Sequence, residues 1–232
     1  MISYKNIKVI AFDADDTLWV NETYYREAEH KFVKLLSKYE TKNKLDQELF
    51  LMEMKNLGLY GYGIKSFVLS MIESALALSN YKIKPTVIQQ IIDIGKEMLE
   101  KPIELLEGVE ETLKALNPHY KLILATKGDL LDQERKLEKS KLAKYFHHIE
   151  IVSDKKPANY QKIVNRLEVA PSEFLMIGNS LKSDVLPLLE IGSNAIHIPF
   201  HTTWAHEVVT HNGNDNDFKT IEKLHDILTI LK

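Results

Sequence analysis

The sequence contains no cysteine, which excludes disulfide bonds and thiolate metal ligands. No stretch approaches the roughly 20 apolar residues that a membrane-spanning helix needs. The first residues, Met1 to Asn6, lack the long apolar segment of a signal peptide. No internal repeat or low-complexity segment is present. These absences predict a cytoplasmic protein without a membrane partner.

The net charge of the chain is slightly negative, unlike that of a typical nucleic-acid-binding protein. The chain has a formal net charge of −3, so it offers no electrostatic sign of a nucleic-acid partner. With 232 residues, of which 44% are hydrophobic, it is long enough for a large core and for either one domain or two.

One short stretch near the N-terminus organises the rest of the chain. Val9 to Phe12 is an apolar run that predicts a strand buried on both faces, and the carboxylates of Asp13, Asp15 and Asp16 follow it directly. Ligands of open α/β sheets bind at the carboxyl ends of the strands. Clustered carboxylates repel one another, and a hard divalent cation with oxygen ligands, such as magnesium, is their natural compensation.

Helical periodicity then runs from about Glu22 to Met98 without a convincing strand. It predicts an insertion of about four helices. Three glycines in Leu57 to Gly63 are expected to break the second of them. The same segment carries Tyr60 and Tyr62, which either face the active site or simply pack on the insertion, and the two alternatives weigh about equally.

Strands and helices alternate from about Pro102 onward, which predicts a parallel, doubly wound α/β sheet. A single tail helix is expected from the apolar spacing of Ile221, Leu224, Ile227, Leu228 and Leu231. The later strands are expected at Leu122–Thr126, Ile149–Val152, Phe174–Ile177 and Ala195–Ile198, with helices at Val109–Leu116, Leu130–Glu138, Ala158–Leu167 and Val185–Ile191.

Polar residues follow several of these strands. Thr126 closes the second strand, Lys156 precedes Pro157 and a helix, and Gly178 stands six residues before Asp184. Taken singly, such a threonine is usually structural, such a lysine is usually solvated, and such an aspartate often caps a helix.

Taken together and in this order, the residues resemble the four motifs of the haloacid dehalogenase-like (HAD) hydrolases. The first motif is matched by Asp13 and Asp15, the second by Thr126, the third by Lys156, and the fourth by Gly178 to Asp184. The resemblance implies a Rossmann-like catalytic core formed by residues 1–19 and 103–232. Residues 20–102 would be the inserted helical cap domain.

The resemblance also implies a site. Asp13 would be the nucleophile and Asp15 the general acid and base. Mg²⁺ would be held by Asp13, the Asp15 carbonyl, Asp184 and Asn179. Phosphate would be bound by Thr126, Lys127 and Lys156; Lys155 is a substitute for Lys156, which is preferred because it directly precedes Pro157.

Three positions depart from the family pattern. Asn179 stands where the family usually has aspartate, which removes one negative charge from the metal site. Lys127 stands where the family often has asparagine, and Asp16 where it often has glycine; we expect Asp16 to be a solvated turn carboxylate. A zinc site at His201 and His206 is disfavoured, because no recognisable ligand spacing completes it.

The sequence therefore predicts a magnesium-dependent phosphatase that acts on a small phosphate monoester through an aspartyl-phosphate. Alternatives of the same fold are a phosphoryl transferase or mutase and a 2-haloacid dehalogenase, and a catalytically silent binding protein is a fourth. Asp15 and Asp184 argue against the dehalogenase, and retention of the whole residue set argues against the silent protein. Neither the substrate nor the oligomeric state follows from the sequence.

Overall fold

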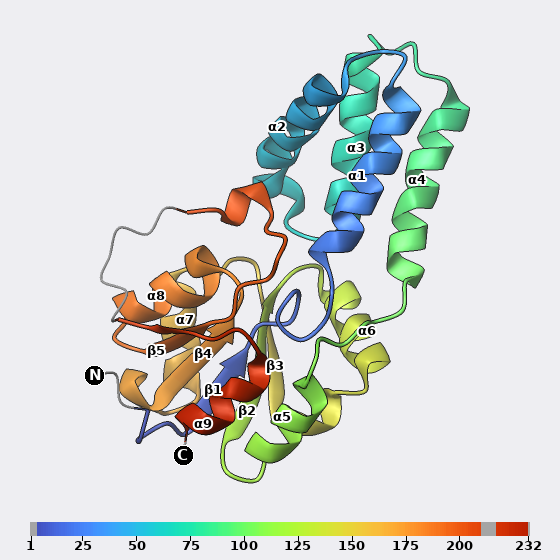
Figure 1. The fold of residues 1–232 in the computed structure, drawn as a ribbon. Coiled ribbons are helices and arrows are strands. Elements are labelled where there is room, and N and C mark those ends of the chain that lie inside the picture. The colour runs from blue at the N-terminus through green and yellow to red at the C-terminus, as the bar shows by residue number, and fades with distance from the viewer. Residues whose placement is uncertain (1–3, 210–216, 232) are drawn as a thin grey trace. The chain divides into compact units, whose positions relative to one another are not determined.

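A computed structural model describes residues 4–209 and 217–231 of the chain. It contains a six-stranded parallel sheet in the order β3-β2-β1-β4-β5-β6 (Figure 1). The strands are β1 (Val9–Phe12), β2 (Lys121–Lys127), β3 (His148–Val152), β4 (Phe174–Gly178), β5 (Asn194–His197) and β6 (Lys219–Thr220). The predicted doubly wound α/β fold is confirmed.

The chain divides into two compact units, which are described separately. The first comprises Met1–Glu22, Ile103–Lys127 and Lys136–Lys232, and it holds the sheet. The second comprises Thr23–Pro102 and Gly128–Arg135. The division runs through the helix α6 (Leu130–Ser140), whose first turns belong to the second unit.

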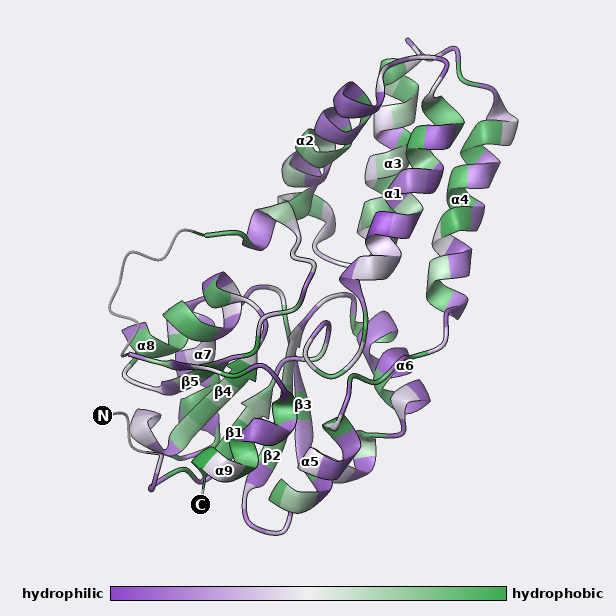
Figure 2. Cartoon of the chain, in the orientation of Figure 1, coloured by the Kyte–Doolittle hydropathy of each residue, from purple (hydrophilic) through white to green (hydrophobic). Residues whose placement is uncertain are grey.

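In the sheet unit, β1 is buried on both faces, as its unbroken apolar sequence predicts. Ile10 and Phe12 join a core with α5 (Val109–Leu116) and α9 (Ile227–Ile230). Val9 and Ala11 point to the opposite core. That second core includes residues of α7 (Pro157–Arg166) and α8 (Leu186–Glu190). Figure 2 shows the result as largely hydrophobic strands between helices of mixed character.

The second unit is helical and has a core of its own. Its helices are α1 (Glu22–Leu36), α2 (Lys42–Tyr60), α3 (Ile64–Leu78) and α4 (Pro85–Glu100). The helix α2 continues through Gly58 and ends at Tyr60; the next residue is Gly61, whose positive φ of 71° favours glycine. The Tyr60 hydroxyl donates to Glu73 on α3 at 3.0 Å, which ties this side chain to its own unit.

Two expectations for the C-terminal part are wrong. The strand β6 was not expected, because its two residues are polar and exposed and it forms only by pairing with β5. The tail helix is shorter than expected: a 3-10 turn, Leu224–Asp226, runs directly into α9 (Ile227–Ile230), and Ile221 lies outside it because the backbone at Lys223 is extended. The apolar residues Ile221, Leu224 and Ile227 are nevertheless buried.

No helix in the described part of the chain is long and apolar enough to cross a membrane.

Candidate active site

The site lies at the carboxyl ends of three neighbouring strands. The strand β1 pairs with β2 on one side and β4 on the other, so Phe12 is in register with Leu124 and Ile177. The chain then continues as Asp13, whose N–H donates to the Ile177 carbonyl at 2.9 Å. Since parallel strands end at one edge, the residues that follow β1, β2 and β4 come together there.

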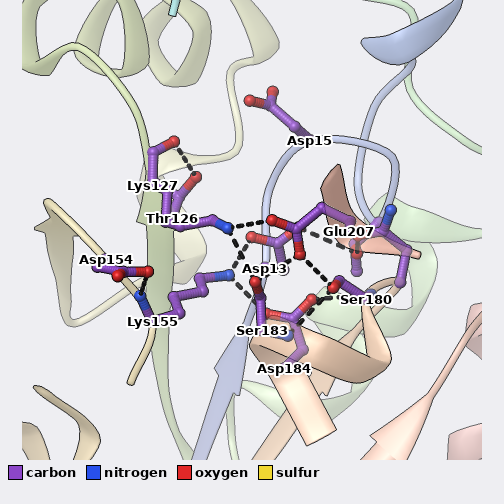
Figure 3. A network of polar contacts seen from close by, with 12 residues as sticks. Asp13, Asp15, Thr126, Lys127, Asp154, Lys155, Ser180, Ser183, Asp184 and Glu207 are labelled. Carbon is purple, nitrogen blue, oxygen red and sulfur yellow. Dashed lines mark hydrogen bonds and ion pairs between the residues drawn. The ribbon is translucent and has the colours of Figure 1, made fainter. Parts of the chain in front are cut away.

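The centre of the site is a buried ion cluster formed by Asp13, Asp184 and Lys155 (Figure 3). The Lys155 ammonium donates to Asp13 Oδ1 and, at 2.6 Å, to Asp184 Oδ1. The predicted residues Asp13 and Asp184 are therefore brought together, although they are far apart in sequence.

The predicted position of Lys156 is wrong, and Lys155 occupies it. The side chain of Lys155 is 2% exposed, whereas that of Lys156 is 72% exposed and pairs with Asp154 at 2.9 Å. The backbone at Lys156 is extended, so consecutive side chains point to opposite sides. This alternation turns Lys155 inward and leaves Lys156 on the same side as Asp154.

Asp184 is held by a tight turn after β4. The Ser180 N–H donates to Asp184 Oδ2 at 3.0 Å, and the Ser180 hydroxyl accepts from the Ser183 N–H at 3.1 Å. Asp184 itself lies in a π-helix, Leu181–Val185, a feature frequent at functional sites. Gly178 is required here, because a Cβ at this position would lie 2.3 Å from the Asp184 carboxyl group.

The Asp13 carboxyl group is strongly perturbed. Burial raises its pKa to about 7, and the charge of Asp184 adds to the rise although Lys155 opposes it. One ammonium group therefore does not fully compensate two buried carboxylates. A hard cation, which prefers oxygen ligands, would neutralise the remaining negative charge.

The Asp15 carboxylate points away from Asp13 in Figure 3. It accepts from Trp19 Nε1 at 2.7 Å and from Lys136 Nζ at 3.0 and 3.1 Å. Lys136 also donates to Asn21 at 2.9 Å. No sequence pattern pointed to Lys136, which is 121 residues from Asp15 and lies on a charged helix.

Asp16 is not the solvated turn residue that we expected. It is buried, with a φ of 61°, and its carboxylate accepts from the backbone N–H groups of Asn21 and Glu22. It thus caps the start of α1. The left-handed backbone explains why glycine also suits this position.

Two of the predicted phosphate-binding residues, Thr126 and Lys127, lie at the end of β2. The buried Thr126 hydroxyl donates to the Lys127 carbonyl at 3.3 Å. Lys127 Nζ donates to Ser183 Oγ at 2.8 Å and to Glu207 Oε1 at 2.6 Å. The position of Glu207 was not predicted, because only the folded chain brings the loop after β5 to this point.

Thr17 connects Asn179 to Asp13 of the buried ion cluster. The Thr17 hydroxyl is 3.4 Å from both Asp13 Oδ2 and Asn179 Oδ1. The Asn179 carbonyl accepts from His197 Nε2 at 3.0 Å. The amide oxygen of Asn179 is thus near the nucleophile candidate, as a metal ligand would require.

The donor set fits a hard divalent cation better than zinc. Asp13, Asp184 and Asn179 supply only oxygen atoms, which magnesium prefers. Within residues 4–209 and 217–231, no group of three His, Asp or Glu side chains is arranged to hold a metal ion. A magnesium ion here would therefore use amide or carbonyl oxygen and water besides the two carboxylates.

The chain is similar to known proteins in sequence and in fold. Residues 7–192 match the family model of the haloacid dehalogenase-like hydrolases. N-acylneuraminate-9-phosphatase from Homo sapiens is 24% identical over 204 residues, which cover 82% of this chain and 81% of that protein.

Two solved structures are similar as well. A haloacid dehalogenase-like family hydrolase from Xanthomonas campestris is 36% identical, covers 97% of this chain and 92% of its own, and superposes with a TM-score of 0.86. The putative HAD-hydrolase YfnB from Bacillus subtilis, bound to magnesium, is 18% identical and covers 98% of this chain and 100% of its own, with a TM-score of 0.64. At that identity the second likeness shows the fold alone.

Proposed function

The chain belongs to the haloacid dehalogenase-like hydrolases, as its motifs predict, and from this we propose that it is a magnesium-dependent phosphatase of small phosphate monoesters. The observation that carries the proposal is the buried cluster of Asp13, Asp184 and Lys155 at the end of the central strand. The similarity to a phosphatase from Homo sapiens supports it.

In the proposed reaction, an oxygen of the Asp13 carboxylate attacks phosphorus, and the bond from phosphorus to the leaving alcohol oxygen breaks. Asp15 gives its proton to that oxygen. Water then attacks the aspartyl-phosphate, Asp15 takes a proton from the water, and the bond between phosphorus and Asp13 breaks. Asp15 has to exchange its contact with Lys136 for one with the leaving oxygen.

The remaining residues position the phosphoryl group. Lys155 lowers the pKa of Asp13 against the effect of burial, and so favours its ionised form, and it offsets charge on the phosphoryl oxygens, in place of the predicted Lys156. Thr126 would donate to a phosphoryl oxygen in place of the Lys127 carbonyl. Asp13, Asp184, the Asn179 amide oxygen and the Asp15 carbonyl would hold magnesium. When bound, the metal would neutralise charge between carboxylates and phosphate.

A panel assay tests the proposed function. Purified protein is incubated with phosphate monoesters and magnesium, and inorganic phosphate is measured. We expect phosphate release that stops on chelation and returns with added magnesium. Transfer of the phosphoryl group without phosphate release would indicate a mutase. Halide release from a 2-haloacid, without a metal requirement, would indicate the dehalogenase alternative.

We propose that the helical unit is the cap that selects among substrates, because the catalytic residues address only the phosphate group. The same panel, run with the Tyr62→Ala variant, checks this. A changed ranking among good substrates is expected, with little change for a generic aryl phosphate. A uniform loss across the panel would contradict the assignment of Tyr62 to substrate choice.

The two candidate metal ligands should differ in importance. Asp184→Ala should raise the magnesium concentration for half-maximal activity by at least about tenfold more than Asn179→Ala, because only Asp184 contributes a charge. Titrating activity against magnesium for both variants measures this. Equal shifts for the two would refute the ranking.

A further inference from the structure

Glu207 lies at the end of the loop that follows β5, and it reaches into the site from a distant part of the sequence (Figure 3). Its side chain is only 12% exposed. Its Oε1 accepts from Lys127 Nζ at 2.6 Å, and its Oε2 accepts from Ser180 Oγ at 2.5 Å and Ser183 Oγ at 2.6 Å. Three donors from two strand ends thus converge on one carboxylate.

This carboxylate is ionised in the folded protein. Burial opposes ionisation, but the Lys127 ammonium and the hydroxyls of Ser180 and Ser183 outweigh it and lower the pKa of Glu207 to about 2. The Lys127 side chain is 13% exposed. Lys127 and Glu207 therefore form a largely buried pair of opposite charges, which solvent screens less than a surface pair.

The pair lies next to the proposed phosphate site. Lys127 directly follows Thr126, and its ammonium shares Ser183 with Glu207, one residue before Asp184. Lys155 is already matched by Asp13 and Asp184. Lys127 therefore places a second ammonium group beside the proposed phosphate site, and the charge of this group is paired with Glu207.

We propose that Glu207 is a positioning residue that holds Lys127 as a matched ion pair, and so limits the affinity of the site for the phosphate product. The inference rests on the proposed phosphatase function. A phosphatase must release inorganic phosphate after each turnover, and an excess of positive charge at the site would retain it.

The effect of the Glu207 charge on Lys127 is distinct from a role of Glu207 in anchoring the loop after β5. The loop is also held by Lys182, whose Nζ donates to the His206 carbonyl at 2.7 Å. A glutamine at position 207 keeps the size and an oxygen acceptor for the hydroxyl groups. Glu207→Gln thus removes the charge while the second anchor remains.

The test is the affinity for inorganic phosphate, measured by calorimetry in the presence of magnesium. Glu207→Gln should bind phosphate about tenfold more tightly than the wild type, because the charge of Lys127 is no longer offset. The double variant Glu207→Gln with Lys127→Met should return to within about threefold of the wild type, because the pair is then removed as a whole. A merely structural role predicts weaker binding in the single variant.

Glu173→Gln is the matched control. This variant removes a carboxylate that pairs with Lys8 at 2.6 Å. Glu173 directly precedes β4, so it lies at the N-terminal end of that strand, opposite to the site. The variant should leave the affinity for phosphate unchanged. If the wild type binds phosphate but Glu207→Gln binds it equally or more weakly, the inference about Glu207 is wrong and the proposed function stands. If the wild type neither binds phosphate nor releases it from any monoester, the proposed function itself fails.

Discussion

The Asp13→Asn variant is expected to lose phosphate release by about 10⁴-fold or more, because the amide is nearly isosteric with the carboxylate but is a poor nucleophile. The backbone N–H of Asp13 pairs with the Ile177 carbonyl regardless of the side chain, so the fold should persist. Initial rates on the best substrate of the panel, together with a thermal unfolding curve, check both points.

Asp154→Asn is the control for this prediction. Asp154 is also near the site, but it pairs with the exposed Lys156, and its loss should change the rate by less than about threefold. Mass spectrometry of acid-quenched enzyme should detect a phosphoryl adduct on the wild type and none on Asp13→Asn. Near wild-type turnover by Asp13→Asn would show that the covalent mechanism is wrong.

The second large effect distinguishes two adjacent lysines. Lys155→Met should lower kcat/KM by about 10²- to 10³-fold, because it removes the cation that faces Asp13 and Asp184. Lys156→Met should stay within about twofold of the wild type, since its ammonium is exposed and pairs only weakly with Asp154. The two variants carry the same change at neighbouring positions.

Stability has to be measured beside activity, because Lys155→Met leaves two buried carboxylates without their common partner. Loss of one member of such a cluster typically destabilises by about 3–5 kcal/mol. Lys155→Arg retains the charge and provides a second variant if the methionine variant does not fold. Equal losses in Lys155→Met and Lys156→Met would contradict the assignment.

The sequence was most informative where one short segment carried both structure and chemistry. The apolar run Val9–Phe12 with Asp13 predicted the central strand and the residue at its end, because burial on both faces leaves an unbroken apolar pattern. Glycine at position 178 and the carboxylate at 184 marked the second acidic residue of the cluster, because the end of β4 and the helical turn after it bring the two positions into close contact.

The remaining parts of the site depend on contacts that spacing does not encode. The choice between Lys155 and Lys156 follows from which way an extended backbone faces, and a shift of one residue reverses it. The partners of Lys127 and Asp15 come from residues 80 and 121 positions away. Neither Glu207 nor Lys136 lies in a pattern that distinguishes it from other charged residues.

The strand order has a consequence for biosynthesis. The strand β1 is made before both of its neighbours in the sheet, because β2 and β4 begin only at Lys121 and Phe174. The helical segment Thr23–Pro102, made in between, forms its contacts largely within itself. On the ribosome, therefore, the helices are able to pack before β2 and β4, the strands that pair with Val9–Phe12, have been made. Asp13, the proposed nucleophile, emerges before the helical segment, and the residues described around it are complete only after Glu207 has been added.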